Sequence, residues 1–546
     1  MVRNRCAVSA SPPPPDAGVA AQTAGRLSSH ATIARSTRTI SAATAASRIL
    51  GFVRDLLIAK LFGTGMQAQA FVVAFRVPNL FRDLVAEGAM TTAVVPVLST
   101  YRATQSPEEF WRLAQATFVR IGVAVGILGA LGMLTAPWLV RLIAPGFAAD
   151  PEKFALTVRL TTVFFPFITL VGLWAFFCGL LNSLRHFAAP ALGPAVLNLA
   201  MIAGCLWLAP SMTPPVMGLA WGLMLGGVLQ LAMQLPVAWR QGFRWRWAWQ
   251  HDGSRQMMRL LAPRLIGAAV YQVSVLFNTV LASLGALAGE GAVAALYFAN
   301  RLVQLPLALF ATASAQASLP ELSERAALRD VQAFHGTLLS VLRKVMFESL
   351  PAAVGLLILA TPIIRVCFQR GAFDQAATAM TAQTLGFLAV GLGAYSASKV
   401  LSGAFYALHD TRTPVALAAE ALAVNVVLAV VFVGPLRVGG LALATALSSS
   451  LNAWRLLRKL ELRLQRPLVA HLVDPFIRMG GAALLMGLVC WALWTGLGAQ
   501  MPSTVKLLLV IVGGILSYGA GCAAFRVAEM SATVQWLGSA LRRRPS

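Results

Sequence analysis

The stretch VRLTTVFFPFITLVGLWAFFCGLLN, residues 158–182, carries a single charged side chain, that of Arg159. A helix that crosses a bilayer needs about 20 consecutive and mostly apolar residues, so this stretch predicts a transmembrane helix. Of all 546 residues, 58% are apolar and 12% are charged, and the mean hydropathy is +0.72. Soluble domains are roughly 45–50% apolar and about 25% charged. The composition therefore excludes an ordinary soluble enzyme, a disordered chain and a disulfide scaffold.

Similar apolar runs, separated by polar turns or by turns with Pro or Gly, recur along the chain. They predict about fourteen transmembrane helices and thus an all-α polytopic membrane protein. The predicted spans are 41–62, 68–99, 114–143, 158–182, 188–209, 215–238, 262–285, 291–318, 338–365, 377–406, 413–433, 438–456, 476–498 and 505–526. The two longest, which contain Pro78 and Pro306, are expected to kink or to extend beyond the bilayer.

Basic residues outnumber acidic ones by 44 to 20, which gives a net charge of +24. On a soluble domain this excess would indicate nucleic-acid binding. Here the arginines concentrate in residues 240–264, 455–478 and 542–544, whereas the turns at 210–217 and 286–292 contain no Lys or Arg. This distribution follows the positive-inside rule, so we expect no nucleic-acid partner. Both termini are predicted to be cytoplasmic.

An internal repeat connects the two halves of the chain. Residues 93–99 (AVVPVLS) return as residues 317–323 (ASLPELS), and the Leu and Pro that bound residues 184–190 return at 408 and 414, each at an offset of 224. Six spans separate the copies, so both halves share one orientation. The pattern predicts two six-helix lobes related by a parallel pseudo-two-fold repeat, plus two extra C-terminal helices.

This repeat sets the predicted domain organisation. Residues 1–40 contain a run of prolines and no apolar stretch, which excludes a secretory signal peptide. They are predicted to form a disordered cytoplasmic arm, although their Arg-rich, acid-poor composition also resembles a transit peptide. The further divisions are an N-terminal lobe (41–240), a basic cytoplasmic linker (241–261), a C-terminal lobe (262–460), the final two helices (461–530) and a basic cytoplasmic tail (531–546).

Charged residues inside the predicted spans are the candidate functional residues. An arginine at mid-membrane costs about 2.5–3.5 kcal/mol on insertion scales, so such residues normally face protein or water. Arg76 and Arg301 occupy matching places in the two halves, 225 residues apart. We expect a cationic cavity between the halves, although Arg54 and Asp55 are equally compatible with the membrane–water interface. The candidates are Arg48, Arg54, Arg76, Arg82 and Arg301, with Asp55, Asp83 and Glu87 as acidic or structural partners.

Guanidinium groups bind phosphate or carboxylate bidentately, so such a cavity predicts an anionic, phosphate-bearing substrate. The sequence contains neither a phosphate-binding G-x-x-x-x-G-K-[ST] motif nor H-E-x-x-H or C-x-x-C, and its histidines are scattered. These observations predict a transporter rather than an enzyme, without a cofactor or a metal site. The energy source is expected to be the membrane potential or a coupled cation.

Several segments resemble the MurJ/MviN family of lipid II flippases, which belongs to the MOP exporter superfamily. The resemblance covers residues 40–530 and is specific because the motifs occur together. They are SRILGFVRD (47–55), FGTG (62–65), PNLFR (78–82), AEGA (86–89), QRGAF (369–373), FYALHDTRTP (405–414) and GGLA (439–442).

The resemblance implies the substrate, which is undecaprenyl-diphosphate carrying the peptidoglycan disaccharide-pentapeptide. It also implies two lobes around a central cationic cavity, and a groove along the last two helices for the lipid tail. By matched position Arg48, Arg54 and Arg301 correspond to essential cavity arginines, Arg82 to the first of an Arg-Arg pair, and Glu87 to a family acidic residue. The chain departs from the family pattern at three positions that we expect beside the cavity: Gln69, Asp83 and Asn300.

The family resemblance places the protein in the bacterial cytoplasmic membrane, in contact with lipid II and membrane lipids, and as a monomer. An alternative of the same class is a flippase for polyprenyl-linked O-antigen or exopolysaccharide. A membrane glycosyltransferase would need an acid/base carboxylate at a site outside the membrane. The predicted outward loops are too short to build such a site.

Overall fold

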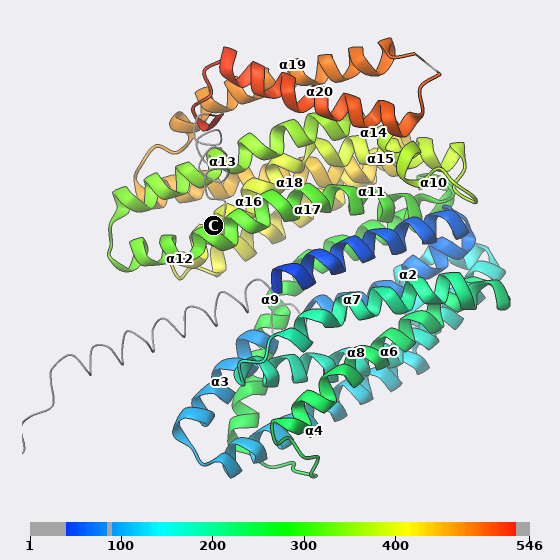
Figure 1. Cartoon of the computed structure of the whole chain (residues 1–546), viewed down its shortest axis with the longest axis vertical. Helices are drawn as coiled ribbons and strands as arrows, with labels where there is room; N and C mark the ends of the chain where they lie inside the picture. Colours follow the sequence, from blue (N-terminus) through cyan, green and yellow to red (C-terminus); the bar gives the residue numbers. More distant parts are fainter. Residues whose placement is uncertain (1–39, 85–89, 499, 531–546) are drawn as a thin grey trace, which may run out of the picture.

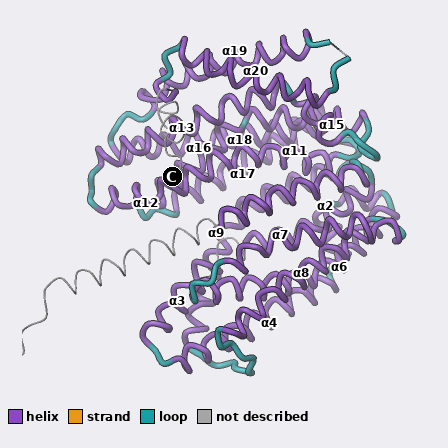
Figure 2. The backbone as a smooth tube through the Cα atoms, in the orientation of Figure 1, coloured by secondary structure: helices purple, strands orange, loops and turns teal. Residues whose placement is uncertain are grey.

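We describe a computed structural model of the chain, which covers residues 40–84, 90–498 and 500–530, with the side chains of residues 83–93 and 259–271 left out. Throughout this described part the chain forms helices joined by loops, and it contains no strand (Figure 2). The predicted all-α polytopic class is confirmed. Glu87, the basic tail and all of the arm except Ile40 lie outside the described residues. The side chain of Asp83 also lies outside them.

The first half of the chain begins with a helix over residues 40–62. It continues with α2 (Met66–Leu84), α3 (Met90–Thr104), α4 (Pro107–Leu134), α5 (Ala136–Ile143), α6 (Pro151–Ser183), α7 (Ala188–Ala203) and α8 (Val216–Arg240). Short 3-10 or π segments follow α5 and α7: η2 (Pro145–Ala149), η3 (Gly204–Leu208) and η4 (Ala209–Ser211).

The second half comprises α9 (Asp252–Ser283), α10 (Gly285–Ala288), α11 (Ala292–Pro306), η5 (Leu307–Thr312), α12 (Ala313–Ala327), α13 (Val331–Ile358), α14 (Ala360–Phe368), α15 (Gln375–Val390), α16 (Leu392–Ala407), α17 (Arg412–Leu436) and α18 (Val438–Leu464). The chain ends with α19 (Val469–Gly496) and α20 (Ser503–Ala524).

Each predicted span coincides with one helix or with consecutive helices. The span predicted over residues 68–99 coincides with α2 and α3 on either side of residues 85–89, which lie outside the described residues. A π-helical turn over residues 307–312 follows Pro306, within one continuous candidate span of 36 residues, Ala292–Ala327. By length and composition alone, eight helices of the described part qualify as membrane spans, or ten if each of two bent pairs counts as one.

The internal repeat is visible in the helix boundaries. The helices α4, α5, α6 and α7 begin at residues 107, 136, 151 and 188, and α13, α14, α15 and α17 begin at 331, 360, 375 and 412, each 224 residues later. The turns repeat as well, because Arg185 and His409, also 224 apart, both have a positive φ, of 63° and 56°. Equivalent sequence therefore builds equivalent backbone in both halves.

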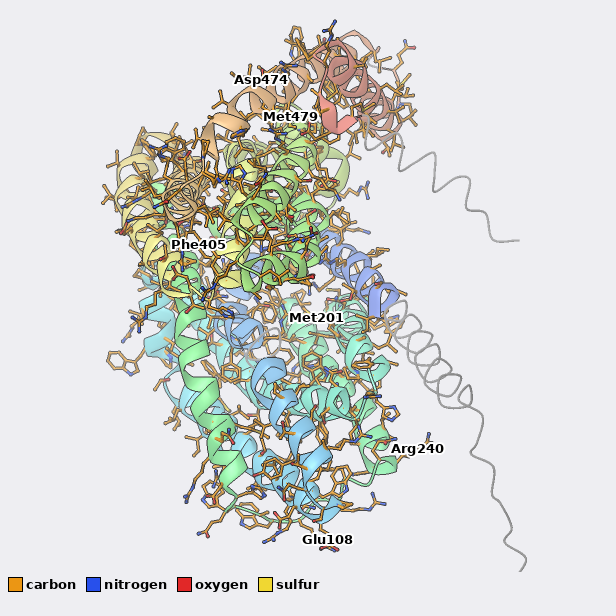
Figure 3. The ribbon with its side chains drawn as sticks, turned by 90° about the vertical axis from the view of Figure 1, so that its left-hand side faces the viewer. Glu108, Met201, Arg240, Phe405, Asp474 and Met479 are labelled. Atoms are coloured by element: carbon orange, nitrogen blue, oxygen red, sulfur yellow. The ribbon has the colours of Figure 1, made fainter. Side chains whose placement is uncertain are left out.

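The helices form two bundles that lie side by side (Figure 1). One contains the helix over residues 40–62 and α2 to α8, and the other contains α10 to α18, with the hairpin of α19 and α20 packed on its outside against α13. The helix α9 packs against α3 of the first bundle and α17 of the second. In the side view, Glu108 and Arg240 lie in the first bundle, and Phe405, Met479 and Asp474 lie in the second (Figure 3). The exact domain boundaries given above stay predictions.

One apolar cluster crosses the boundary between the bundles. Phe62 and Phe71 of the first bundle belong to the same buried cluster as Phe298, Phe368 and Phe373 of the second. The rings of Phe298 and Phe373 lie 5.6 Å apart, edge to face, a geometry that aromatic pairs prefer. The two bundles are thus joined by buried apolar surface near the loops that follow the first helix and α14.

Candidate functional site

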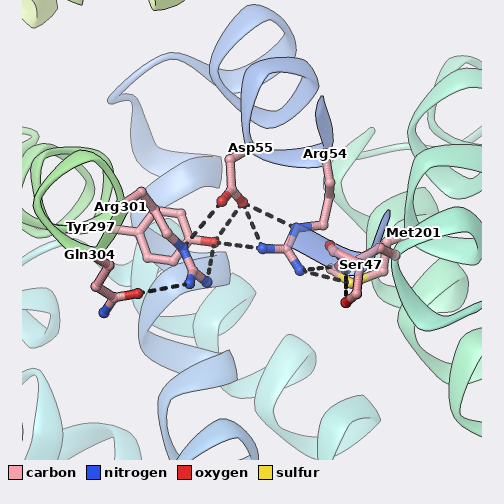
Figure 4. Close-up of polar contacts among 8 residues, drawn as sticks. Ser47, Arg54, Asp55, Met201, Tyr297, Arg301 and Gln304 are labelled. Atoms are coloured by element: carbon pink, nitrogen blue, oxygen red, sulfur yellow. Dashed lines mark hydrogen bonds and ion pairs between the residues drawn. The ribbon is translucent and has the colours of Figure 1, made fainter. Parts of the chain in front are cut away.

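A network of charged and polar groups bridges the two bundles at the middle of the first helix (Figure 4). Arg54 donates from Nε and Nη2 to Asp55 Oδ1, at 3.0 and 2.8 Å. Both residues are buried, with exposed fractions of 7% and 2%. A buried ion pair remains stable only when further hydrogen bonds satisfy its groups, and the surrounding helices supply these.

The second bundle contributes Tyr297 and Arg301, one helical turn apart on α11. The Tyr297 hydroxyl donates to Asp55 Oδ1 at 2.9 Å and accepts from Arg301 Nη2 at 3.2 Å and from Arg54 Nη2 at 3.4 Å. Arg301 Nε pairs with Asp55 Oδ2 at 3.1 Å. Its guanidinium lies 4.9 Å from the centre of the Tyr297 ring. Asp55 therefore binds one arginine from each bundle.

The first bundle fixes the other side of Arg54. Arg54 Nη1 donates to Asn198 Oδ1 on α7 at 2.9 Å and lies 3.8 Å from Met201 Sδ. The Asn198 amide in turn donates to the backbone oxygen of Ser47 at 3.0 Å. The conformation of Arg54 is thus fixed by the first helix, α7 and α11 together.

The two bridging arginines differ in their access to a ligand. A guanidinium has five N–H groups, and Arg54 makes five polar contacts in this network. The side chain of Arg301 is 30% exposed, and its Nη1 reaches Gln304 Oε1 at only 3.4 Å. Arg301 is therefore the arginine of this pair that a ligand reaches first.

The structure brings three of the predicted residues together: Arg54, Asp55 and Arg301. Arg48 lies on the same helix as Arg54 and is exposed, and Arg76 and Arg82 lie on α2 and are half-buried. Asp83 and Glu87, as stated above, lack described side chains. The prediction that these groups line a substrate cavity stays a prediction.

Sequence reasoning missed Tyr297 and Asn198. Tyr297 precedes Arg301 by four residues, the spacing that places side chains on one helix face, and this signal was available in the sequence. Asn198 is a single amide in an apolar span, where a buried polar group needs a partner. Among the described residues no group of three or more His, Cys, Asp or Glu is arranged to hold a metal ion.

Two of the sequence motifs meet across the bundles, at the end of the molecule opposite the arginine-rich loops. Ala372 N donates to Lys60 O at 2.9 Å. Gly63 and Gly371 both adopt positive φ, of 55° and 60°. A Cβ on Gly63 would overlap the carbonyl oxygen of Ala372, and a Cβ on Gly371 would overlap that of Lys60. Only glycine permits this approach. We call the contact of residues 60–64 with residues 371–373 the outer closure.

A polar cluster lies beside the outer closure, around a small cavity of about 230 Å³. The Lys153 ammonium is buried and donates to Gln69 Oε1 and to Glu290 Oε2, both at 3.2 Å. Gln69 donates to the Thr64 carbonyl at 3.2 Å. Gln69, which we expect beside the charged cavity, lies near the start of α2 and accepts from this lysine. Asn300 precedes Arg301 on α11 and is exposed.

Comparison with known proteins gives consistent results. The protein-family model described as "Lipid II flippase MurJ" matches residues 58–511. A "Lipid II flippase MurJ" of Burkholderia cenocepacia is 34% identical over 486 residues, which are 87% of this chain and 93% of the relative. A "Probable lipid II flippase MurJ" of Rhizobium tropici is 37% identical over 424 residues, 77% of this chain and 79% of the relative.

Solved structures agree with these relatives. A structure of "Lipid II flippase MurJ, inward closed conformation" is similar with a TM-score of 0.76 at 26% identity, over 89% of this chain and 98% of that one. An inward-facing multidrug resistance MATE family transporter of the MOP superfamily is similar with a TM-score of 0.65 at 15% identity, over 77% of this chain and 94% of that one. At this identity the similarity shows a shared fold and nothing about function. With the family model matching most of its length, the chain belongs to the family described as lipid II flippase MurJ.

Proposed function

We propose that this protein moves lipid II from the inner to the outer leaflet of the bacterial cytoplasmic membrane, for cell-wall synthesis. It is a transporter and not an enzyme, and it acts as a monomer without metal or cofactor. The observation that carries the proposal is the network in which Asp55 joins Arg54 of one bundle to Arg301 of the other. Family membership supplies the substrate.

The diphosphate of the substrate binds first at Arg301. Its guanidinium is partly exposed, whereas the N–H groups of Arg54 all have partners. Arg48 is exposed on the helix that carries Arg54, and Arg76 and Arg82 on α2 add positive charge. A charge-assisted hydrogen bond is roughly twice as strong as a neutral one, so two or more guanidinium groups select a diphosphate over neutral lipids.

Binding then exchanges one anion for another. In the structure the Asp55 carboxylate pairs with both arginines, as the phosphate of a bound substrate would. The diphosphate replaces Asp55 at Arg301, while Arg54 keeps Asp55 and Asn198. The polar contact between the bundles is thereby weakened only when substrate is present, and the bundles rotate against one another in alternating access.

Delivery to the outer leaflet requires the outer closure to open. The loop charges assign this end to the outer side and both termini to the cytoplasm. An inside-negative potential favours outward movement of negative charge by about 2.3 kcal/mol per charge per 100 mV. The potential, or a cation that moves with the substrate, supplies the energy.

The test is complementation of a bacterial strain depleted of its own lipid II flippase, with labelled lipid II followed at the cell surface. The wild-type chain is expected to prevent lysis and to deliver lipid II outward. Arg301→Ala is expected to reduce delivery at least about tenfold, the cost of a charged hydrogen bond. Arg458→Ala, an exposed arginine of α18, serves as the control.

Undiminished delivery by Arg301→Ala at normal protein levels would contradict the binding site. Loss of surface glycan without lysis, when the protein's own host is depleted of it, would instead identify a flippase for O-antigen or exopolysaccharide.

A further inference from the structure

A second hollow, of about 440 Å³, lies between α14 and α15 of the second bundle, outside the bridging network. The helix α14 bends away from α13 by 76°, so the hollow lies in the elbow that this bend makes. Thr361 and Arg365 line it from one face of α14, and Gln375 and Gln383 from one face of α15. Its volume falls within the range of roughly 300–1,000 Å³ typical of small-molecule sites.

The repeat gives the residues around this hollow counterparts in the first bundle. Arg365 is equivalent to Arg141 at the offset of 224, because α5 and α14 begin at equivalent residues. In the first bundle the Arg141 guanidinium lies 5.4 Å from the Trp138 ring and 5.5 Å from the Phe154 ring. The residues that match Trp138 and Phe154 are Pro362 and Thr378. The aromatic partners of the arginine are therefore absent in the second bundle.

Smaller side chains also line the hollow on α15. Where the first bundle has Val158 and Thr162, the second has Ala382 and Gly386, and both of these line the hollow. Together with Thr378 in place of a phenylalanine, three lining positions lose volume, whereas Phe387 in place of Val163 gains volume. The hollow therefore opens beside Arg365, where the two aromatic neighbours of Arg141 have no counterpart.

The side chains that line the hollow, and their positions, indicate which kind of ligand it binds. Arg365 is exposed, and among the described residues its side chain makes no hydrogen bond or ion pair. In the part of the chain that the structure describes, no Asp or Glu lines the hollow, and the amides of Gln375 and Gln383 and the hydroxyl of Thr361 offer hydrogen-bond donors around the guanidinium, whereas the Thr378 hydroxyl donates to the Asp374 carbonyl. The rim carries Leu357, which is 46% exposed. One cation, several neutral donors and an apolar rim match a singly charged phosphate attached to acyl chains.

We propose that this hollow binds the phosphate headgroup of an anionic phospholipid, such as phosphatidylglycerol, in the outer leaflet. The position of the hollow, at the end where the outer closure lies, rests on the orientation proposed above. Arg365 pairs with the phosphate, Gln375 and Gln383 donate to its oxygens or to the glycerol hydroxyls, and the acyl chains pass over Leu357. The site differs from the bridging network, which binds its anion between the bundles.

The experiment is native mass spectrometry of the full chain, purified in detergent and supplied with phosphatidylglycerol, with phosphatidylethanolamine or with undecaprenyl diphosphate. The wild type is expected to retain one phosphatidylglycerol. Arg365→Ala is expected to lower this retention at least about tenfold. Thr378→Phe combined with Ala382→Val, which restores the side-chain volume of the first bundle, is expected to do the same. The control is Arg141→Ala, which removes the equivalent arginine and is expected to leave retention unchanged.

Equal losses in Arg141→Ala and Arg365→Ala, or full retention in the Arg365→Ala and filled variants, would overturn the proposal. Retention of undecaprenyl diphosphate but not phosphatidylglycerol through Arg365 would overturn the choice of lipid. Retention of phosphatidylethanolamine as tight as that of phosphatidylglycerol would overturn the selection for net charge. Lipid retention is measured without any transport step. The result would therefore still test this proposal even if the proposed transport function failed.

Discussion

Asp55 is the residue that holds together the polar network between the bundles. A carboxylate buried in a membrane protein is costly unless it is paired and hydrogen-bonded, and here two arginines and a tyrosine satisfy it. Removing one member of a buried pair leaves the other uncompensated, at about 3–5 kcal/mol. In the proposed mechanism, the same arrangement binds an incoming anion when Asp55 releases Arg301.

The Tyr297 hydroxyl is expected to stabilise this network measurably. Tyr297→Phe removes the group that donates to Asp55 and accepts from both arginines, while the ring stays beside Arg301. Loss of a hydrogen bond to charged groups should lower the free energy of unfolding by about 1.5–3 kcal/mol, measured by chemical denaturation in detergent. Tyr406→Phe, at a tyrosine that is 47% exposed, is the control. Equal effects of the two substitutions would contradict the assigned role.

At the scale of the element, the turn before α17 shows how a short motif fixes a helix start. Asp410 Oδ1 accepts from the Thr413 backbone N–H at 3.0 Å, and Oδ2 accepts from the Thr413 hydroxyl at 2.8 Å. Arg463 of α18 donates to the same carboxylate. The hydrogen bond from Thr413 N, together with the hydroxyl and Arg463, lowers the pKa of Asp410 below its ordinary value. This carboxylate therefore caps α17 and joins it to the end of α18.

The lowered pKa predicts a pH dependence with a definite sign. Because the folded protein favours the charged form, the stability from Asp410 is present above its unfolded pKa of about 3.9 and is lost as the pH falls through the folded pKa. Asp410→Asn should lower the free energy of unfolding by up to about 1 kcal/mol near pH 7, because an asparagine still accepts from the Thr413 N–H and only the charge that pairs with Arg463 is lost. The difference from wild type should shrink below about pH 4.

Thermal unfolding in detergent at several pH values measures this difference. Asp474→Asn, which removes the carboxylate of an exposed pair with Arg478, is expected to have a smaller effect at every pH. A difference between wild type and Asp410→Asn that grows on acidification would show that the sign is wrong.

At the scale of the whole molecule, the two bundles are joined at two levels. The bridging network lies at the middle of the first helix, and the outer closure lies beyond its end. The closure relies on two glycines with positive φ, because the carbonyls of Ala372 and Lys60 occupy the space that a Cβ would need. Alternating access must separate the closure without disturbing the packing inside each bundle.

Gly371→Ala is therefore expected to favour the outward-open state. An alanine at positive φ costs about 1–2 kcal/mol, and its Cβ overlaps the Lys60 carbonyl. In a cysteine-free chain with Gln69→Cys, a position that is 3% exposed in the wild type, this substitution should increase labelling by a membrane-impermeant thiol reagent added outside cells. A gain of roughly five- to thirtyfold corresponds to that energy.

Gly434→Ala is the matched control, because a Cβ there meets no atom within 4 Å. If both alanine substitutions leave Gln69→Cys unlabelled, the closure does not control access from this side. If Gly434→Ala labels as strongly as Gly371→Ala, the effect is not specific to the closure.

The sequence by itself determined the helices, the repeat and the family. Hydrophobicity is a property of each short segment, so the apolar run at residues 158–182 predicts α6 directly. The offset of 224 residues predicts the helix starts that repeat in the second half. The cost of charge in a membrane also singled out Arg54, Asp55 and Arg301 before any coordinates. These inferences need only the order of residues along the chain.

Only the tertiary structure decided which charges are satisfied and which are accessible. Arg54 and Arg301 are separated by more than two hundred residues, and no spacing shows that one carboxylate and Tyr297 bind both. The contact of Gln69 with the buried Lys153 likewise joins residues 84 positions apart, which no local pattern shows. The hollow beside Arg365 depends on the 76° bend between α13 and α14, which no residue spacing shows. The physical reason is that burial and pairing depend on how helices pack, which distant parts of the chain set together.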